Sequence, residues 1–140
     1  MNKLYKTNFK TLETEFKDII KSIRETDSTG EISTSLITRK TYILINKKKL
    51  YVPEFTSKNV IKKYYYDLYD ENNKVIMKFH SEPHNDKRYQ TSTEPFHIHG
   101  NENSKLTNEK RFPNYNFKSL WDIMEFLRLM IIYFDEMPHY

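Results

Sequence analysis

Histidines gather in one stretch of the chain. Four of the five lie within residues 79–99, which read FHSEPHNDKRYQTSTEPFHIH. His97 and His99 are separated by one residue, and residues i and i+2 of an extended chain project from the same side. His80 and His84 stand at the other end of a polar loop. Imidazole titrates near neutral pH and also binds metals, so this stretch is the first candidate for chemistry.

Two kinds of chemistry suit these histidines. Without a metal or any other cofactor, one imidazole takes the proton of a ribose 2′-OH, whose oxygen attacks the adjacent phosphorus, and a second imidazole protonates the leaving 5′-oxygen. The predicted catalytic residues for this reaction are His84, His97 and His99. The alternative is a divalent metal ion, for which the candidate ligands are His80, His84, His97 and His99.

The same stretch carries side chains that could hold an RNA substrate. Cations stabilise the negative charge that develops on phosphoryl oxygens, and a tyrosine can donate a hydrogen bond or stack on a base. The predicted substrate-binding residues are therefore Lys78, Lys87, Arg88 and Tyr89. Three consecutive tyrosines at positions 64–66 could also stack on bases, although aromatic residues of strands usually pack in the core.

Composition excludes several other kinds of site. The chain has no cysteine, which removes thiol catalysis and thiolate metal sites, and it has only two glycines, too few for a glycine-rich phosphate loop. The net charge of +4 permits a nucleic-acid partner without requiring one. No apolar run is long enough to span a membrane and no leader precedes the first helix, so we expect a cytoplasmic protein with no membrane partner.

The length of 140 residues predicts a single domain over 1–140. Near its start, apolar residues recur at spacings of three and four, which predicts a helix that Thr11 caps and that ends by Glu25. The apolar positions of this helix are Phe9, Leu12, Phe16, Ile19, Ile20 and Ile23.

Four segments have the composition of strands: residues 38–46, 49–56, 60–69 and 74–80. The short break between the first two predicts an antiparallel hairpin, and Pro53 makes the second an edge strand or ends it early. The chain is extended again at residues 95–99, where Phe96 and Ile98 should face the core while His97 and His99 face the other way. Residues 100–116 show no clear periodicity.

The last predicted element is a helix from its cap Ser119 to about Glu136, before Pro138. Its apolar surface is much wider than the roughly 100° stripe that a surface helix needs. Either the fold covers both flanks of this helix or part of it pairs with a second chain, and we expect the second arrangement, which would make a homodimer. The predicted fold class is α+β, with an antiparallel sheet of about four to six strands flanked by an N-terminal and a C-terminal helix.

The order of these motifs resembles a known family. A tyrosine-rich strand is followed by the basic-aromatic pair Lys78-Phe79, then Pro83-His84, a spacer, the run from Pro95 to His99 and a terminal helix. This order is similar to that of the TumE toxins of type II toxin–antitoxin modules. The chain departs from their pattern at three places: His80-Ser81 replaces Asp-Asn, Lys78 replaces Arg, and Asn85 replaces a second His.

The resemblance implies a growth-inhibiting protein that a cognate antitoxin neutralises and that acts as a ribosome-dependent ribonuclease. We accordingly predict a toxin that cleaves RNA by histidine acid–base chemistry, with RNA or the ribosome and an antitoxin as partners. Two alternatives stay open on the residues alone. One is a metal-dependent phosphodiesterase or nuclease that uses the same histidines, and the other is a non-enzymatic module that binds nucleic acid or protein.

Overall fold

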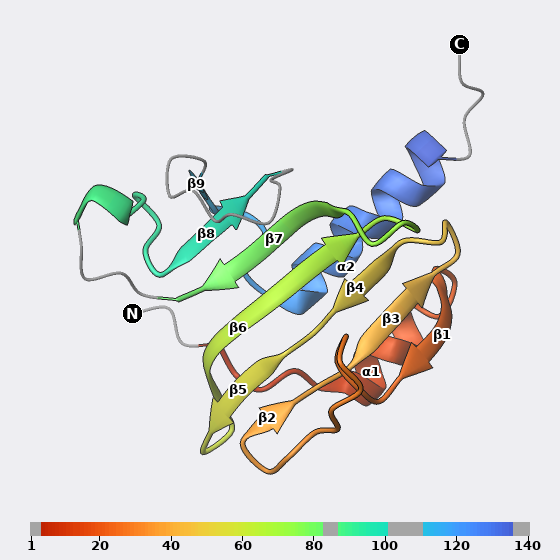
Figure 1. Cartoon of the computed structure of the whole chain (residues 1–140), viewed down its shortest axis with the longest axis horizontal. Coiled ribbons are helices and arrows are strands. Elements are labelled where there is room, and N and C mark those ends of the chain that lie inside the picture. The colour runs from red at the N-terminus through yellow and green to blue at the C-terminus, as the bar shows by residue number, and fades with distance from the viewer. Residues whose placement is uncertain (1–3, 83–86, 101–110, 136–140) are drawn as a thin grey trace.

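In the residues that the structure describes, the chain forms a nine-stranded antiparallel sheet with two helices behind one of its faces (Figure 1). The computed structural model describes residues 4–82, 87–100 and 111–135. Neighbouring strands follow the order β1-β3-β4-β6-β7-β8-β9, and β5 pairs with both β6 and β2. The α+β class predicted from the sequence is confirmed, with more strands than expected.

The first helix is shorter than predicted. Helix α1 spans Phe9–Glu15, and strand β1 follows it at Ile20–Arg24. The prediction that the helix continues to about Glu25 was therefore wrong over its second half. Strand β1 pairs with strand β3 (Thr41–Leu44), so cross-strand hydrogen bonds replace helical ones, and the β-branched isoleucines of β1 suit that conformation.

The N-cap of α1 is Asn8 rather than the predicted Thr11. The Asn8 side chain accepts a hydrogen bond from the Thr11 backbone N–H at 3.1 Å. Thr11 therefore lies in the first turn of the helix, where its N–H is one of the donors that need a capping acceptor.

The centre of the sheet follows the sequence prediction closely. Strand β4 (Lys49–Tyr51) forms the predicted hairpin with β3, and Pro53 separates it from strand β5 (Glu54–Ser57). Strand β6 (Val60–Tyr69) has the predicted bounds, and it pairs with β5 near its start and with β4 near its end. A two-residue strand, β2 (Ile37–Thr38), pairs with β5.

Three further strands complete the sheet and carry most of the histidines. Strand β7 (Val75–Ser81) returns from β6, and the Asp70 carboxylate stabilises the turn by accepting backbone hydrogen bonds from Asn72 and Lys74 at 2.8 and 2.9 Å. Strand β8 (Phe96–His99) pairs with β7, and strand β9 (Arg111–Pro113) pairs with β8. The sequence did not predict β9, because residues 100–116 lack periodicity.

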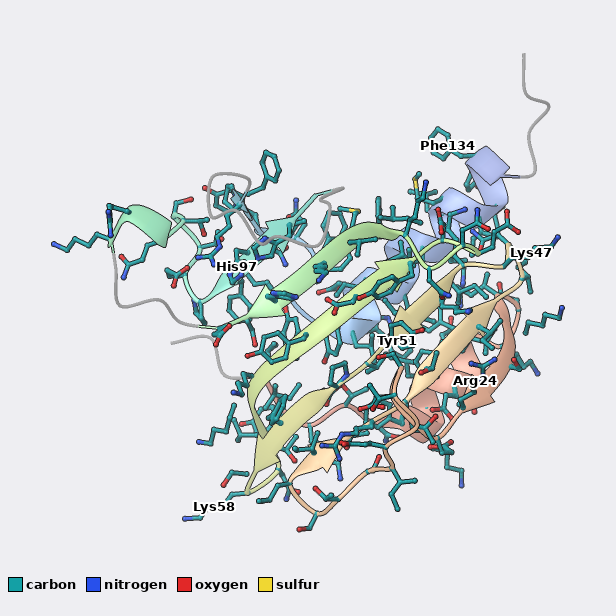
Figure 2. The ribbon with its side chains drawn as sticks, viewed as in Figure 1. Arg24, Lys47, Tyr51, Lys58, His97 and Phe134 are labelled. Atoms are coloured by element: carbon teal, nitrogen blue, oxygen red, sulfur yellow. The ribbon has the colours of Figure 1, made fainter. Side chains whose placement is uncertain are left out.

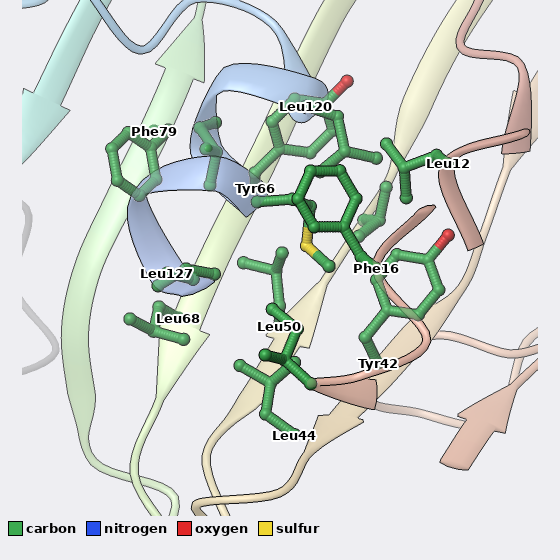
Figure 3. Close-up of a cluster of buried hydrophobic side chains, with 14 of the residues drawn as sticks. Leu12, Phe16, Tyr42, Leu44, Leu50, Tyr66, Leu68, Phe79, Leu120 and Leu127 are labelled. Carbon is green, nitrogen blue, oxygen red and sulfur yellow. The ribbon is translucent and has the colours of Figure 1, made fainter. Parts of the chain in front are cut away.

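Both helices pack on the same face of the sheet and enclose the core (Figure 3). Helix α2 spans Leu120–Met130, and Ser119 caps it as predicted, accepting from the Asp122 N–H at 3.1 Å. Tyr64 and Tyr66 of β6 are fully buried and stack on each other at 4.1 Å between ring centroids. These two tyrosines are therefore core residues and offer no surface for stacking bases.

Beyond Met130 the terminal helix continues as a π-helical turn, η3 (Ile131–Asp135). Ile123, Met124 and Leu127 of α2 are buried, but large apolar side chains near the end of the helix are exposed. These exposed side chains are Leu129, Ile132, Tyr133 and Phe134. In the described parts of the chain, no helix has both the length and the apolar character needed to cross a membrane.

Candidate functional site

The register between β7 and β8 brings three histidines to one place. His80 lies directly opposite His97, and Lys78 lies directly opposite His99. Successive side chains of a strand alternate between the two faces of the sheet. These four residues therefore share the face opposite to Phe79, which is fully buried among the core residues. Figure 2 shows His97 on β8, near the edge of the sheet where β8 and β9 lie.

The three imidazole rings form a compact cluster, which we call the three-histidine cluster (His80, His97 and His99). Ring centroids are 5.6 Å apart for His80 and His97, and 4.9 Å apart for each of the other two pairs. One ring nitrogen from each residue lies within 4.8 Å of the other two. The exposed fraction is 7% for His80 and 1% for both His97 and His99. The prediction that His97 and His99 project together is thus confirmed, and His80 joins them.

Neighbouring groups hold two of these rings by hydrogen bonds. Nε2 of His80 lies 3.0 Å from Oδ1 of Asp67 on β6, and Nδ1 of His97 lies 3.2 Å from the carbonyl oxygen of Pro95. A carboxylate and a carbonyl oxygen can only accept, so the ring nitrogen donates in both cases. In the neutral rings the lone pair therefore lies on Nδ1 of His80 and on Nε2 of His97.

Tyr65 of β6 adds an aromatic contact to the cluster. Its ring meets the His80 ring edge to face, with 5.0 Å between centroids. Burial raises the pKa of the Tyr65 hydroxyl to about 12, and a hydrogen bond to the nearby Glu82 carboxylate acts in the same direction. The hydroxyl is therefore protonated at neutral pH and serves as a hydrogen-bond donor.

His99 is neutral over the ordinary pH range. Its pKa is lowered to about 3, first by burial and then by the neighbouring His80, His97, Arg111 and Lys78, which disfavour a further positive charge. Neutral His99 can accept a hydrogen bond or bind a metal ion, but it does not carry a proton that it could give to a leaving group at pH 7.

Two cations lie beside the cluster. Lys78 and Arg111 are the cross-strand partners of His99, on β7 and β9 respectively. Lys78 was predicted from the sequence as a substrate-binding residue, and the structure places it next to the cluster. Arg111 was missed because it belongs to the strand that the sequence did not predict. Asp67 was also missed, although its position between Tyr66 and Leu68, both core residues, indicated that it faces away from the core.

The other predicted site residues lie on the connection between β7 and β8. Lys87 and Arg88 have exposed side chains on a short 3-10 helix, η1 (Lys87–Tyr89), which Tyr89 completes. His84, the third predicted catalytic residue, lies outside the described residues. The structure therefore brings His97, His99 and Lys78 together with His80, which was predicted only as a possible metal ligand.

The donor set limits what the cluster can do chemically. Three imidazoles can transfer protons between substrate atoms, or they can hold a metal ion that prefers nitrogen ligands, such as zinc, copper, iron or nickel. Magnesium and calcium prefer oxygen ligands and do not suit this set. The adjacent cations favour a substrate with negative charge, such as a phosphodiester.

Comparisons with known proteins identify the family. No curated protein and no solved structure matched this chain. A family model described as "Toxin TumE" matches residues 8–128, a segment that contains the three-histidine cluster, Asp67, Lys78 and Arg111. Because this match covers most of the 140 residues, the chain belongs to the TumE toxin family.

Proposed function

We propose that this protein is the toxin of a type II toxin–antitoxin module and that it cleaves RNA at the three-histidine cluster. Membership of a toxin family supports the first part. The observation that carries the second is the convergence of His80, His97 and His99, beside Lys78 and Arg111, on one face of the sheet. Its partners are then a cognate antitoxin and RNA, free or on the ribosome.

The acid–base form of this reaction assigns different roles to the histidines. Nε2 of His97 is suited to take the proton of the ribose 2′-OH, because Nδ1 already donates to the Pro95 carbonyl. The acid must carry a proton before the reaction. His80 suits that role by geometry, because Asp67 at 3.0 Å holds its Nε2–H and leaves Nδ1 for the proton that is transferred.

The reaction also requires that the negative charge that develops on the phosphoryl group be stabilised. Lys78 and Arg111 would stabilise this charge, and their position as cross-strand neighbours of His99 supports that role. Neutral His99 would accept a hydrogen bond or help to orient the substrate. The connection before β8 carries four further residues whose roles in catalysis or substrate binding stay predictions: His84, Lys87, Arg88 and Tyr89.

Burial sets a condition on substrate binding. His97 and His99 are each 1% exposed, so a phosphodiester cannot contact them in the structure as it stands. RNA binding must therefore be accompanied by a local opening around the cluster. Such openings are common at sites where a substrate is enclosed during the reaction.

The direct test is RNA cleavage by the purified chain, with and without ribosomes. We expect His97→Ala and His80→Ala to lower the cleavage rate by about 100-fold or more, because general acid–base catalysis contributes about that much. His139→Ala is the matched control, because it also removes a histidine but at a position 40 residues after His99 in the sequence. The same variants, at unchanged protein level, should relieve the growth arrest caused by expression.

Two results would contradict the proposal. One is cleavage and growth arrest that persist in both His80→Ala and His97→Ala. The other is tight binding of RNA with a steep dependence on salt and no cleavage under any condition, which would indicate a binding module instead.

A further inference from the structure

The three-histidine cluster has the form of a metal-binding site. We propose that His80, His97 and His99 bind one divalent transition-metal ion of the zinc class and leave a fourth coordination position open. The ion would sit between β7 and β8, which supply all three ligands from two directly paired strands. This arrangement is typical of catalytic zinc sites, which have three protein ligands, whereas structural sites have four.

The distances permit such a site with small side-chain movements. Ring nitrogens no more than 4.8 Å apart leave a central point within about 2.8 Å of each, whereas zinc–imidazole bonds measure about 2.0–2.1 Å. Each nitrogen would have to move inward by about 0.8 Å at most, which small rotations within one rotamer provide. The β-strand backbone can therefore stay in place.

The outer partners of the rings provide an independent argument. Histidines that bind metals usually donate their second ring N–H to a carboxylate or a backbone carbonyl. His80 does so to Asp67 and His97 does so to Pro95, at 3.0 and 3.2 Å. These hydrogen bonds select Nδ1 of His80 and Nε2 of His97 as the ligand atoms. An ion bound to these nitrogens would take them out of proton transfer, so the metal-dependent reaction is an alternative to the acid–base form described above.

The charges around the cluster bear on what fills the open position. Lys78 and Arg111 lie beside His99 and oppose the binding of a dication, whereas Asp67 beside His80 favours it. An anionic oxygen at the fourth position would offset the two cations. A phosphoryl oxygen of RNA would meet this requirement, and this part of the inference rests on the proposed function. The metal would then polarise the phosphoryl group as a Lewis acid.

Metal binding can be measured without RNA. The full-length chain is stripped with a chelator and titrated with Co²⁺ or Zn²⁺ alone, with Mg²⁺ as the ion that should not bind. We expect one equivalent of Co²⁺ to give the visible absorption band of a tetrahedral site, and Zn²⁺ to displace it. His139→Ala should bind as the wild type does. Each of His80→Ala, His97→Ala and His99→Ala should weaken binding by more than about 100-fold, and Asp67→Asn by about 10- to 100-fold.

A second measurement uses only the wild-type chain, so its result does not depend on whether the variants fold. In the wild-type chain, one equivalent of Zn²⁺ should shift the imidazole ¹⁵N resonances of the three cluster histidines and leave that of His139 in place. Absence of stoichiometric binding to the folded wild type, or binding that all three cluster variants retain, would overturn the metal site. RNA cleavage that continues in EDTA would overturn a metal role in the reaction and leave the proposed function standing. Metal binding with no RNA cleavage would confirm the site and contradict the function.

Discussion

Oδ1 of Asp67 lies 3.0 Å from Nε2 of His80, across the ladder that pairs β6 with β7. The two residues are diagonal neighbours in that ladder, because Asp67 is directly opposite Lys78 and His80 is directly opposite Tyr65. Asp67 therefore orients a ring of the three-histidine cluster without belonging to the cluster itself.

Replacing Asp67 should disturb the reaction through His80. We expect Asp67→Asn to lower RNA cleavage by about 10-fold or more, as removal of such an orienting partner does at comparable sites. Imidazole ¹⁵N spectra should show the His80 tautomer changing, which a general loss of stability would not produce, and Asp67→Glu should restore part of the rate. The matched control is Asp18→Asn, which removes an exposed carboxylate near Arg128. Equal rates for Asp67→Asn and wild type would exclude this positioning role.

Arg111 should contribute to RNA binding through charge. Removing one cation that neutralises a phosphate lowers the slope of log affinity against log salt by about 0.7 for a single strand. We expect this change in Arg111→Ala, together with slower cleavage, and none in Lys17→Ala, an exposed cation on the connection between α1 and β1. Fluorescence anisotropy of a labelled RNA at several salt concentrations measures the slope. An unchanged slope in Arg111→Ala would mean that Arg111 does not face the RNA backbone.

A buried carboxyl should make the stability depend on pH. Glu54 is fully buried, and its Oε2 accepts hydrogen bonds from the hydroxyls of Thr7 and Tyr66 at 2.5 and 2.7 Å. Burial raises its pKa above the ordinary value of 4.5 despite these hydrogen bonds. The folded chain thus holds this proton more tightly than the unfolded chain, so the contribution of Glu54 to the free energy of unfolding falls as pH rises through the raised pKa.

Glu54→Gln resembles the protonated form at every pH. We therefore expect the stability difference between Glu54→Gln and wild type to shift in favour of the variant as pH rises from about 4 to 8. Urea unfolding followed by circular dichroism gives this difference at each pH. Glu71→Gln, at an exposed turn position, is the control and should show no such trend. A difference that is constant with pH, or that shifts the other way, would contradict the raised pKa.

The exposed end of the terminal helix should govern self-association. Leu129, Ile132 and Tyr133 are exposed and, at spacings of three and four, lie on one side of the helix, where they offer an apolar surface for the predicted homodimer contact. We expect Ile132→Glu to shift the chain toward the monomer in sedimentation velocity runs. Ile32→Glu is the matched control, because Ile32 is 69% exposed and lies on another part of the chain. A wild-type chain that sediments as a monomer at high concentration would exclude the homodimer.

Local patterns accounted for much of the fold. The alternation in residues 60–69 predicted β6 with its correct bounds, and the turn after it predicted the return of β7. Ser119 was recognisable as a cap because the apolar run of α2 begins directly after it. In each case the signal lies within a few residues of the feature that it predicts, so no knowledge of the tertiary structure was needed.

What the sequence could not show depends on pairing between distant strands. Ile19 and Ile23 fit a helical spacing, and only the partner β3 makes residues 20–24 a strand. The contact of Asp67 with His80 likewise depends on the register between β6 and β7, which a shift of one residue would change completely. The position of Arg111 beside His99 depends in the same way on the register between β8 and β9. The histidines were identifiable from their spacing, and Lys78 from its position beside them in the sequence, but Asp67 and Arg111 were not.

Successive side chains of β7 lie on opposite faces of the sheet, so that Phe79 is in the core and His80 is in the three-histidine cluster. A shift of this strand by one residue would exchange the two, putting a phenyl ring in the site and an imidazole among apolar side chains. Misfolded copies of the chain would therefore lack both a sound core and a working site. If the proposed toxin activity resides in this cluster, only molecules with β7 in its correct register would be toxic.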